Sequence, residues 1–300
     1  MIIHTENLSK AYGQRDAVRG VNLAVPAGSA YALIGANGAG KTTTVRMLMN
    51  ILEPSDGKAT VLGVDSRKLS RDQFAQIGFV SESQDMPARL KVGQYLDYLR
   101  PFYATWDRLL ERSILNELKL PLEQRIGDLS HGTRMKLRLA CALPFKPKLL
   151  MLDEPLSGLD PLVRDEVMER LLLQADEMTI FISSQELTDI EGTVTHLGFL
   201  ENGRLLFQEP MSELSARVRE VRVTLADEAV RPPTAPVDWI NVSTSGNVLS
   251  FVDVRFSQDK LSGLITALLR GVRNVEVQPI ALRSIFIALA RSSQNRESGT

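Results

Sequence analysis

Nine consecutive residues near the start of the chain have the types and spacing that bind the phosphates of a nucleotide. Lys41 supplies a cation that would bridge the β- and γ-phosphates, and the hydroxyl of Thr42 is placed to bind Mg²⁺. Gly35 and Gly40 allow backbone angles that a β-carbon forbids, so successive N–H groups can curl around phosphate oxygens. We therefore predict a phosphate-binding loop made of Gly35, Ala36, Asn37, Gly38, Ala39, Gly40, Lys41, Thr42 and Thr43.

Two adjacent carboxylates add the chemistry that such a loop lacks. Asp153 and Glu154 follow the apolar run Leu149–Leu152, which is typical of a buried strand. Such a strand would deliver Asp153 to the loop, where it can hold Mg²⁺ through a water molecule. Glu154 can polarise the water that attacks the γ-phosphate. Lys41 and Glu154 are thus candidate catalytic residues, and Thr42 and Asp153 are candidate metal ligands.

The apolar pattern around these residues predicts a parallel α/β core. The apolar stretch 31–34 lies directly before the loop, and the residues after the loop have a helical period. The run 179–182 is a further buried strand, and a crossover helix is predicted between it and the strand before Asp153. Other strands are predicted at 21–25, at 77–80 and in a hairpin about Asn202-Gly203, and helices over 88–143.

Another helix start is predicted in the run Leu129-Ser130-His131-Gly132-Thr133. Ser130 suits the N-cap position, because its hydroxyl can accept a hydrogen bond from a free backbone N–H. The helical period places Leu137, Ala140 and Cys141 on one side of this helix, and Arg134 and Arg138 on the other.

A domain boundary is predicted near residue 215, where the pattern changes. Beyond it we expect strands at 221–225 and on both sides of Ser245-Gly246-Asn247, a helix over 261–269, a strand at 275–277 and a last helix over 282–289. The chain would then contain a domain of residues 1–215, with a helical subdomain over about 88–143, and a small α+β domain of residues 216–290. Residues 291–300 are polar and are expected to be disordered.

Composition limits the classes of function. The 300 residues have a formal net charge of −1, which gives no bulk attraction to nucleic acid or to an anionic membrane. The single cysteine, Cys141, cannot form an internal disulfide, which fits a reducing cytoplasm. The first twelve residues lack the pattern of a signal peptide, and no apolar run approaches the ~20 residues that cross a bilayer. If the chain serves a membrane process, we expect another chain to span the membrane.

The order of these motifs resembles that of the ATP-binding subunits of ABC transporters. The phosphate loop, the Ser-x-Gly helix start at Ser130, the strand ending in Asp153-Glu154-Pro155 and the run Ser157-Gly158-Leu159-Asp160 follow one another within residues 1–215. The resemblance implies ATP and Mg²⁺ as cofactors. It also implies an α/β fold, with a P-loop core, an antiparallel β subdomain, a helical insertion and a small α+β C-terminal domain.

The same resemblance implies a homodimer that encloses two ATP molecules. Ser130 and Gly132 of one subunit would close over the ATP held by the phosphate loop of the other, with the N-terminus of their helix aimed at the γ-phosphate. Tyr12 would stack on the adenine, and Asp160 would contact the partner subunit.

Two positions depart from the family pattern. After the strand at 77–80, the family has a glutamine that touches Mg²⁺ and senses the transmembrane partner. Here Glu82 stands at that position, with Gln84 as the alternative, and a carboxylate can still accept hydrogen bonds from metal-bound water. After the strand ending at Ile182, the family has a histidine that contacts the γ-phosphate. Here that residue is Gln185, which can donate a hydrogen bond but cannot exchange a proton.

Two further similarities concern the membrane partner. Residues 216–300, with the run Ala281-Leu282-Arg283-Ser284-Ile285-Phe286, resemble the C-terminal domain of subunits paired with separately encoded exporter-type permeases. The stretch Phe102–Asp107 falls where a cytoplasmic helix of such a permease would dock, and exposed aromatic residues suit an interface. Packing inside the helical subdomain is an equally good interpretation of this stretch.

We therefore interpret the chain as a cytoplasmic ATPase, peripheral on the inner face of the cell membrane, that dimerises around ATP and drives a separate transmembrane permease. No nucleic-acid partner is expected. The alternative is an ATP-gated regulatory clamp with little turnover, which Gln185 favours and the intact Glu154 disfavours. A third hypothesis, a relative acting on ribosomes or DNA, would require two ATP modules or a long coiled coil, and the chain has neither.

Overall fold

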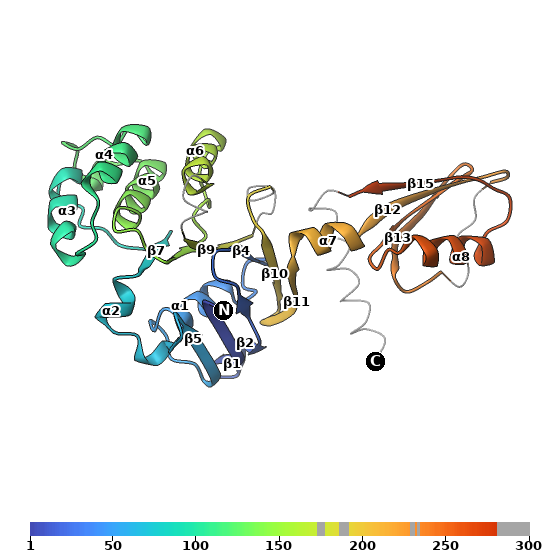
Figure 1. The fold of residues 1–300 in the computed structure, drawn as a ribbon, viewed down its shortest axis with the longest axis horizontal. Coiled ribbons are helices and arrows are strands. Elements are labelled where there is room, and N and C mark those ends of the chain that lie inside the picture. Colours follow the sequence, from blue (N-terminus) through green and yellow to red (C-terminus); the bar gives the residue numbers. More distant parts are fainter. Residues whose placement is uncertain (173–177, 186–191, 229–231, 233–234, 281–300) are drawn as a thin grey trace. The chain divides into compact units, whose positions relative to one another are not determined.

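The chain forms two compact units, Met1–Gln208 and Glu209–Thr300, in a computed structural model (Figure 1). The structure describes residues 1–172, 178–185, 192–228, 232 and 235–280. The predicted boundary near 215 falls inside α7 (Met211–Arg217), the first helix of the second unit. Among the described residues, no helix is both long and apolar enough to span a membrane.

A six-stranded sheet forms the centre of the first unit. Its neighbouring strands are parallel from β10 to β7, and β11 is the second arm of the predicted Asn202-Gly203 hairpin. Every residue of β4 and β8 is buried, as the unbroken apolar runs predict. The strand order is β11 (Arg204–Pro210), β10 (His196–Glu201), β4 (Ala30–Ile34), β9 (Thr179–Ser184), β8 (Leu149–Asp153) and β7 (Ile77–Ser81).

The register of this sheet brings the ends of the functional strands together. Ile34 lies opposite Ser184, and Asp153 lies between Ser183 on one side and Ser81 on the other. Since parallel strands share their carboxyl edge, the phosphate loop meets Asp153, the last residue of β8, and Glu154 at that edge.

A second sheet, largely antiparallel, packs against the first through one apolar core. The predicted strand at 21–25 is wrong in one respect, because it is divided between two strands. The hydroxyl of Thr5 donates to the Val21 carbonyl at 2.7 Å and accepts the Leu23 N–H at 2.7 Å, which breaks the backbone ladder at that point. The strands are β1 (Ile3–Tyr12), β2 (Arg15–Val21), β3 (Ala24–Val25), β5 (Asp56–Val61) and β6 (Val64–Asp65).

Helices complete the first unit, and three of them cluster as a helical subdomain (Figure 1). α1 (Lys41–Leu48) follows the phosphate loop, α2 (Arg71–Phe74) precedes β7, and α6 (Pro161–Leu172) is the predicted crossover helix between β8 and β9. The subdomain contains α3 (Val92–Leu99), α4 (Arg108–Glu117) and α5 (His131–Ala142).

One face of α5 differs from the prediction. Arg138, expected on the polar side, is only 8% exposed. Its guanidinium donates to the backbone carbonyl of Gln84 at 2.9 Å, which draws the side chain between α5 and the segment after β7. Burial lowers the pKa of Arg138, and the charge of the neighbouring Arg134 lowers it further.

Two residues of the aromatic stretch at 102–107 pack inside the helical subdomain, as one of the two interpretations predicts. Tyr103 stacks on Phe145 with ring centroids 4.0 Å apart, and the Trp106 indole donates to Glu111 at 2.8 Å. Phe102, in contrast, is exposed and makes an edge contact with the exposed Tyr98. The inner residues therefore hold the subdomain together, while the outer pair forms an apolar surface.

The second unit is a four-stranded antiparallel sheet that buries one face against a helix. Trp239 stacks on Phe251 in its core, with ring centroids 3.9 Å apart. Its strands follow the order β13 (Trp239–Ser245), β14 (Val248–Asp253), β12 (Arg219–Leu225) and β15 (Val272–Pro279), with α8 (Gln258–Leu268). The predicted helix over 282–289 and the predicted disordered tail lie outside the described residues.

Candidate functional site

The phosphate loop connects β4 to α1, and its backbone has the shape that the sequence predicts. Gly38 and Gly40 have positive φ angles of 79° and 109°, and Gly40 is the N-cap of α1. A β-carbon at Gly40 would lie 2.5 Å from the Ala17 carbonyl oxygen. Glycine is therefore required at position 40 by both conformation and space.

Backbone freedom, the predicted reason for glycine at position 35, is not the reason. Gly35 is not among the residues with positive φ. Its requirement is steric, because a β-carbon would lie 2.2 Å from the carbonyl oxygen of Leu200 in β10. The neighbouring hairpin therefore packs directly behind the loop, where Gly203 N–H donates to the Ala39 carbonyl at 3.0 Å.

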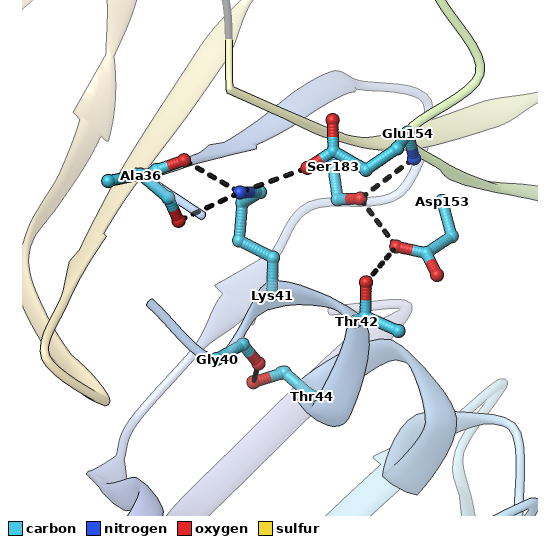
Figure 2. Close-up of polar contacts among 9 residues, drawn as sticks. Ala36, Gly40, Lys41, Thr42, Thr44, Asp153, Glu154 and Ser183 are labelled. Carbon is cyan, nitrogen blue, oxygen red and sulfur yellow. Dashed lines mark hydrogen bonds and ion pairs between the residues drawn. The ribbon is translucent and has the colours of Figure 1, made fainter. Parts of the chain in front are cut away.

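Lys41 is the buried cation of the loop. Its side chain is 4% exposed, and its ammonium group donates to the Gly35 and Ala36 carbonyls at 2.6 and 3.2 Å (Figure 2). The same nitrogen lies 2.9 Å from Oε1 of Glu154. The two candidate catalytic residues are thus in direct contact.

Thr42 and Asp153 meet through hydrogen bonds. The Thr42 hydroxyl donates to Oδ1 of Asp153 at 3.0 Å, and the Ser183 hydroxyl donates to the same oxygen at 2.8 Å (Figure 2). Asp153 is 4% exposed. A hydroxyl and a carboxylate side by side are the hard oxygen donors that Mg²⁺ prefers, and Mg²⁺ takes its remaining ligands from water and phosphate. The residues present therefore fit the predicted metal ion.

Glu154 adopts an unusual backbone conformation. Its φ is +51°, in the left-handed region that residues other than glycine rarely occupy. Its N–H donates to both the carbonyl and the hydroxyl of Ser183, at 3.2 and 3.1 Å. These contacts tie the turn after β8 to the end of β9 and direct the Glu154 carboxylate toward Lys41.

A cleft of about 410 Å³ opens over the loop. Tyr12 stands at its rim, 51% exposed, with the ammonium of Lys10 located 5.6 Å from its ring centroid. An exposed aromatic ring beside a phosphate loop is suited to stacking on a nucleobase. The lining residues are Tyr12, Arg15, Ala17, Asn37, Gly38, Gly40, Lys41, Thr42, Thr43 and Glu154.

Two predicted site residues, Ser130 and Gly132, lie at the start of α5, and neither lines the cleft. Ser130 is exposed and caps α5, its hydroxyl accepting the Thr133 N–H at 3.1 Å. Gly132 faces Val163 of α6, where a β-carbon would lie 3.3 Å away. Asp160 caps α6 by accepting the Val163 N–H at 3.1 Å. The roles of these residues toward a partner subunit stay predictions.

Glu82 and Gln185, the two residues that depart from the family pattern, lie just beyond the carboxyl ends of β7 and β9. Glu82 is exposed, and its N–H donates to the Asp153 carbonyl at 3.3 Å. Its side chain lines a separate polar cavity, together with Gln84, Arg134 and Arg138. Gln185 is exposed and directly follows Ser184, whose carbonyl accepts the Gly35 N–H at 3.3 Å.

Three residues at or near the site were not predicted. Ser183 links Asp153 to Glu154, and a hydroxyl directly after the apolar run 179–182 was a signal that could have identified it. Arg15 lines the cleft. His131 lies within hydrogen-bond distance of the Ser157 carbonyl, with Nε2 3.1 Å from the oxygen, and so links the start of α5 to the segment after Glu154. The last two depend on contacts between distant segments, which a single sequence does not reveal.

Comparisons with known proteins agree with this geometry. A family profile described as ABC transporter matches residues 18–157. The bacitracin transport ATP-binding protein BcrA of Enterococcus faecalis is 34% identical over 223 residues, covering 73% of this chain and 72% of that protein. The Nod factor export ATP-binding protein I of Neorhizobium galegae is 31% identical over 302 residues, covering 96% of this chain and 85% of that protein.

Solved structures share the fold of the first unit. An ATP-binding subunit of an ABC transporter is similar with a TM-score of 0.65 and 26% identity, covering 72% of this chain and 92% of that one. A dimeric ATP-binding cassette with bound ADP and Pi, MJ0796, is similar with a TM-score of 0.61 over 70% of this chain and 98% of that one, at 20% identity. The predicted α/β core with an antiparallel β subdomain and helices is confirmed.

Proposed function

This chain belongs to the ABC transporter family as an ATP-binding subunit, and from that premise we propose that it hydrolyses Mg-ATP as a homodimer and drives a separate transmembrane permease. The observation that carries the proposal is the meeting of Lys41, Thr42, Asp153 and Glu154 at one edge of the parallel sheet. These four side chains supply a phosphate-binding cation, two oxygen donors for a metal ion and a general base.

The contact between Lys41 and Glu154 suggests how the base is controlled. While its carboxylate is held 2.9 Å from the ammonium, Glu154 is engaged by Lys41 and is not free to contact the attacking water. A γ-phosphate competes with Glu154 for Lys41, since both are anions seeking the same buried cation. Binding of ATP therefore frees the carboxylate to take a proton from the attacking water.

Thr42 and Asp153 would hold Mg²⁺, which neutralises charge on the β- and γ-phosphates when bound. Ser183 donates to Asp153 at 2.8 Å and so fixes the rotamer of the carboxylate. Because Ser183 also accepts the N–H of Glu154, one hydroxyl sets the distance between the metal-binding and the proton-accepting groups.

Dimerisation would complete the site from the partner's α5. Ser130 is exposed at the start of this helix, whose first-turn N–H groups and dipole favour an anion. Gln185, next to the first residue of the loop, would donate an amide hydrogen bond to the γ-phosphate. We place the subunit at the inner face of the membrane, with the exposed Tyr98 and Phe102 as the permease contact.

The relatives' names give the direction of transport that we propose. One is named for bacitracin transport and another for Nod factor export. The similarity to the second covers 96% of this chain and therefore extends into the C-terminal unit. We propose that the permease partner is an exporter encoded as a separate chain.

The decisive experiment uses Glu154→Gln, which keeps the shape of the side chain but removes the base. With Mg-ATP this variant should elute as a stable dimer in size-exclusion chromatography, while the wild type turns over and returns to monomer. Glu169→Gln, at an exposed position on α6, is the matched control and should behave as wild type. A Glu154→Gln chain that stays monomeric while ATP is bound would refute the sandwich dimer.

A further inference from the structure

Arg15 lies at the rim of the nucleotide cleft beside the phosphate loop. It is exposed and lines the cleft together with Tyr12 and Gly38. Its Nη2 atom lies 3.7 Å from the position that a β-carbon on Gly38 would take. The guanidinium is therefore in reach of any oxyanion that the middle of the loop holds.

The position of Arg15 is fixed by the hairpin between β1 and β2. Tyr12 and Arg15 are directly opposite each other in the register of this hairpin, on either side of a turn in which Gly13 has a φ of +60°. Side chains at opposite positions of an antiparallel pair lie on the same face of the sheet. The aromatic ring and the guanidinium thus lie side by side on one face of the hairpin, and both residues line the cleft.

Of the two cations that line the cleft, Lys41 and Arg15, only Arg15 is without a carboxylate partner in the described part of the chain. The ammonium of Lys41 is already paired with Glu154 at 2.9 Å. Asp153 is a second carboxylate at the site and accepts a hydrogen bond from the Thr42 hydroxyl. In the described part of the chain, no carboxylate pairs with Arg15, whereas its neighbour Arg19 lies 3.9 Å from Asp16. An approaching polyphosphate therefore meets the Arg15 charge before the Lys41 ion pair opens.

We propose that Arg15 is a nucleotide-affinity residue that binds the base-proximal phosphate while the base stacks on Tyr12. The inference rests on the proposed function, because it needs ATP in this cleft. A planar guanidinium can donate two parallel hydrogen bonds to phosphate oxygens, which the point charge of a lysine cannot reproduce. Since this phosphate is present in both ATP and ADP, Arg15 should stabilise the two nucleotides equally and leave the chemical step unchanged.

The test compares Arg15→Gln and Arg15→Lys with Arg19→Gln as the matched control, in the full chain. Dissociation constants for Mg-ATP and Mg-ADP are measured by calorimetry at low and at high NaCl. Arg15→Gln should weaken both nucleotides by the same factor, about five- to tenfold at low salt. Arg15→Lys should recover part of this loss, and the salt dependence of binding should be shallower in Arg15→Gln than in the wild type.

Steady-state kinetics separate this role from a structural one. Arg15→Gln should raise KM with kcat unchanged, because an interaction that is equal in ground and transition states affects binding alone. Affinities equal to those of Arg19→Gln would overturn the proposal, as would a loss restricted to ATP. A wild-type chain that binds no nucleotide would instead refute the proposed function itself.

Discussion

At the scale of single residues, Gln185 is the position where this chain differs most from the family pattern. It follows Ser184 at the end of β9, one residue beyond the carbonyl that accepts the Gly35 N–H. An amide at this position can orient a γ-phosphate or a water molecule, but it cannot take up a proton. In the mechanism that we propose, the proton from the attacking water then goes to Glu154, and the chemistry depends on that residue alone.

Gln185→His tests this dependence. If the amide already holds the γ-phosphate, wild-type protein should release phosphate measurably, and the histidine should change the rate by about tenfold or less, ~1.4 kcal/mol in the barrier. Phosphate release at saturating Mg-ATP is measured for both chains, with Glu154→Gln as the inactive reference. A wild-type rate no higher than that of Glu154→Gln would contradict the assignment of the chain as an ATPase.

At the scale of elements, the helical subdomain depends on a buried ion pair. Glu111 of α4 is 2% exposed and accepts hydrogen bonds from the Arg100 guanidinium and the Trp106 indole. Burial raises the pKa of Glu111, but the Arg100 hydrogen bonds, the Trp106 hydrogen bond and the positive charge of Arg100 together hold it below its ordinary value. The pair connects the segment after α3 to α4.

Glu111→Gln should lower the free energy of unfolding by about 2 kcal/mol at neutral pH. This is less than the ~3–5 kcal/mol for a fully buried pair, because the Arg100 side chain is 24% exposed. A carboxylate whose pKa is lowered by folding stabilises the fold above its unfolded pKa and loses this effect as the pH falls through the folded value. The gap between wild type and Glu111→Gln should therefore shrink below about pH 4.5.

Urea unfolding at neutral and acidic pH measures this gap. Glu123→Gln serves as the control, since Glu123 pairs with Lys91 at an 87% exposed position, where an ion pair contributes little to stability. A gap that is the same at every pH would show that Glu111 acts through packing and not through its charge.

Elements were the most predictable level of this molecule, because periodicity is a local signal. Apolar runs identified β4, β8 and β9, and the Asn-Gly dipeptide identified the hairpin, with φ angles of 48° and 80° at Asn202 and Gly203. The errors arose where distant segments meet. Arg138 is buried because its guanidinium donates to the Gln84 carbonyl, which lies 54 residues away in the sequence. Position 35 must be glycine because the backbone of β10 leaves no space for a β-carbon. Arg15 escaped notice for the same reason.

At the scale of the whole molecule, the division into two units separates nucleotide chemistry from the C-terminal sheet. The cleft and its hydrogen-bond network lie before Gln208. Gln208 itself belongs to the core, since its side chain accepts the Ala24 N–H at 2.9 Å and donates to the Asn22 carbonyl at 3.0 Å. The first unit therefore includes β11 as far as Gln208.

A chain that ends at Pro210 should fold and bind Mg-ATP within about twofold of the full chain, because domains with their own core fold alone. A chain that ends at Gly203 lacks β11 and should be insoluble or far less stable. Circular dichroism and calorimetry distinguish these results. If the chain ending at Pro210 fails to fold while the full chain folds, the two units depend on each other.

The single cysteine makes this chain convenient for site-directed labelling. Cys141 lies on α5 and is partly buried, and the burial of its thiol raises the pKa above the ordinary value, so the reactive thiolate is scarce at neutral pH. A second cysteine introduced at the exposed Ser113 of α4 would therefore react first with a maleimide spin label, without removal of the native thiol. Distances between two such labels would report directly on whether ATP brings the helical subdomains of two subunits together.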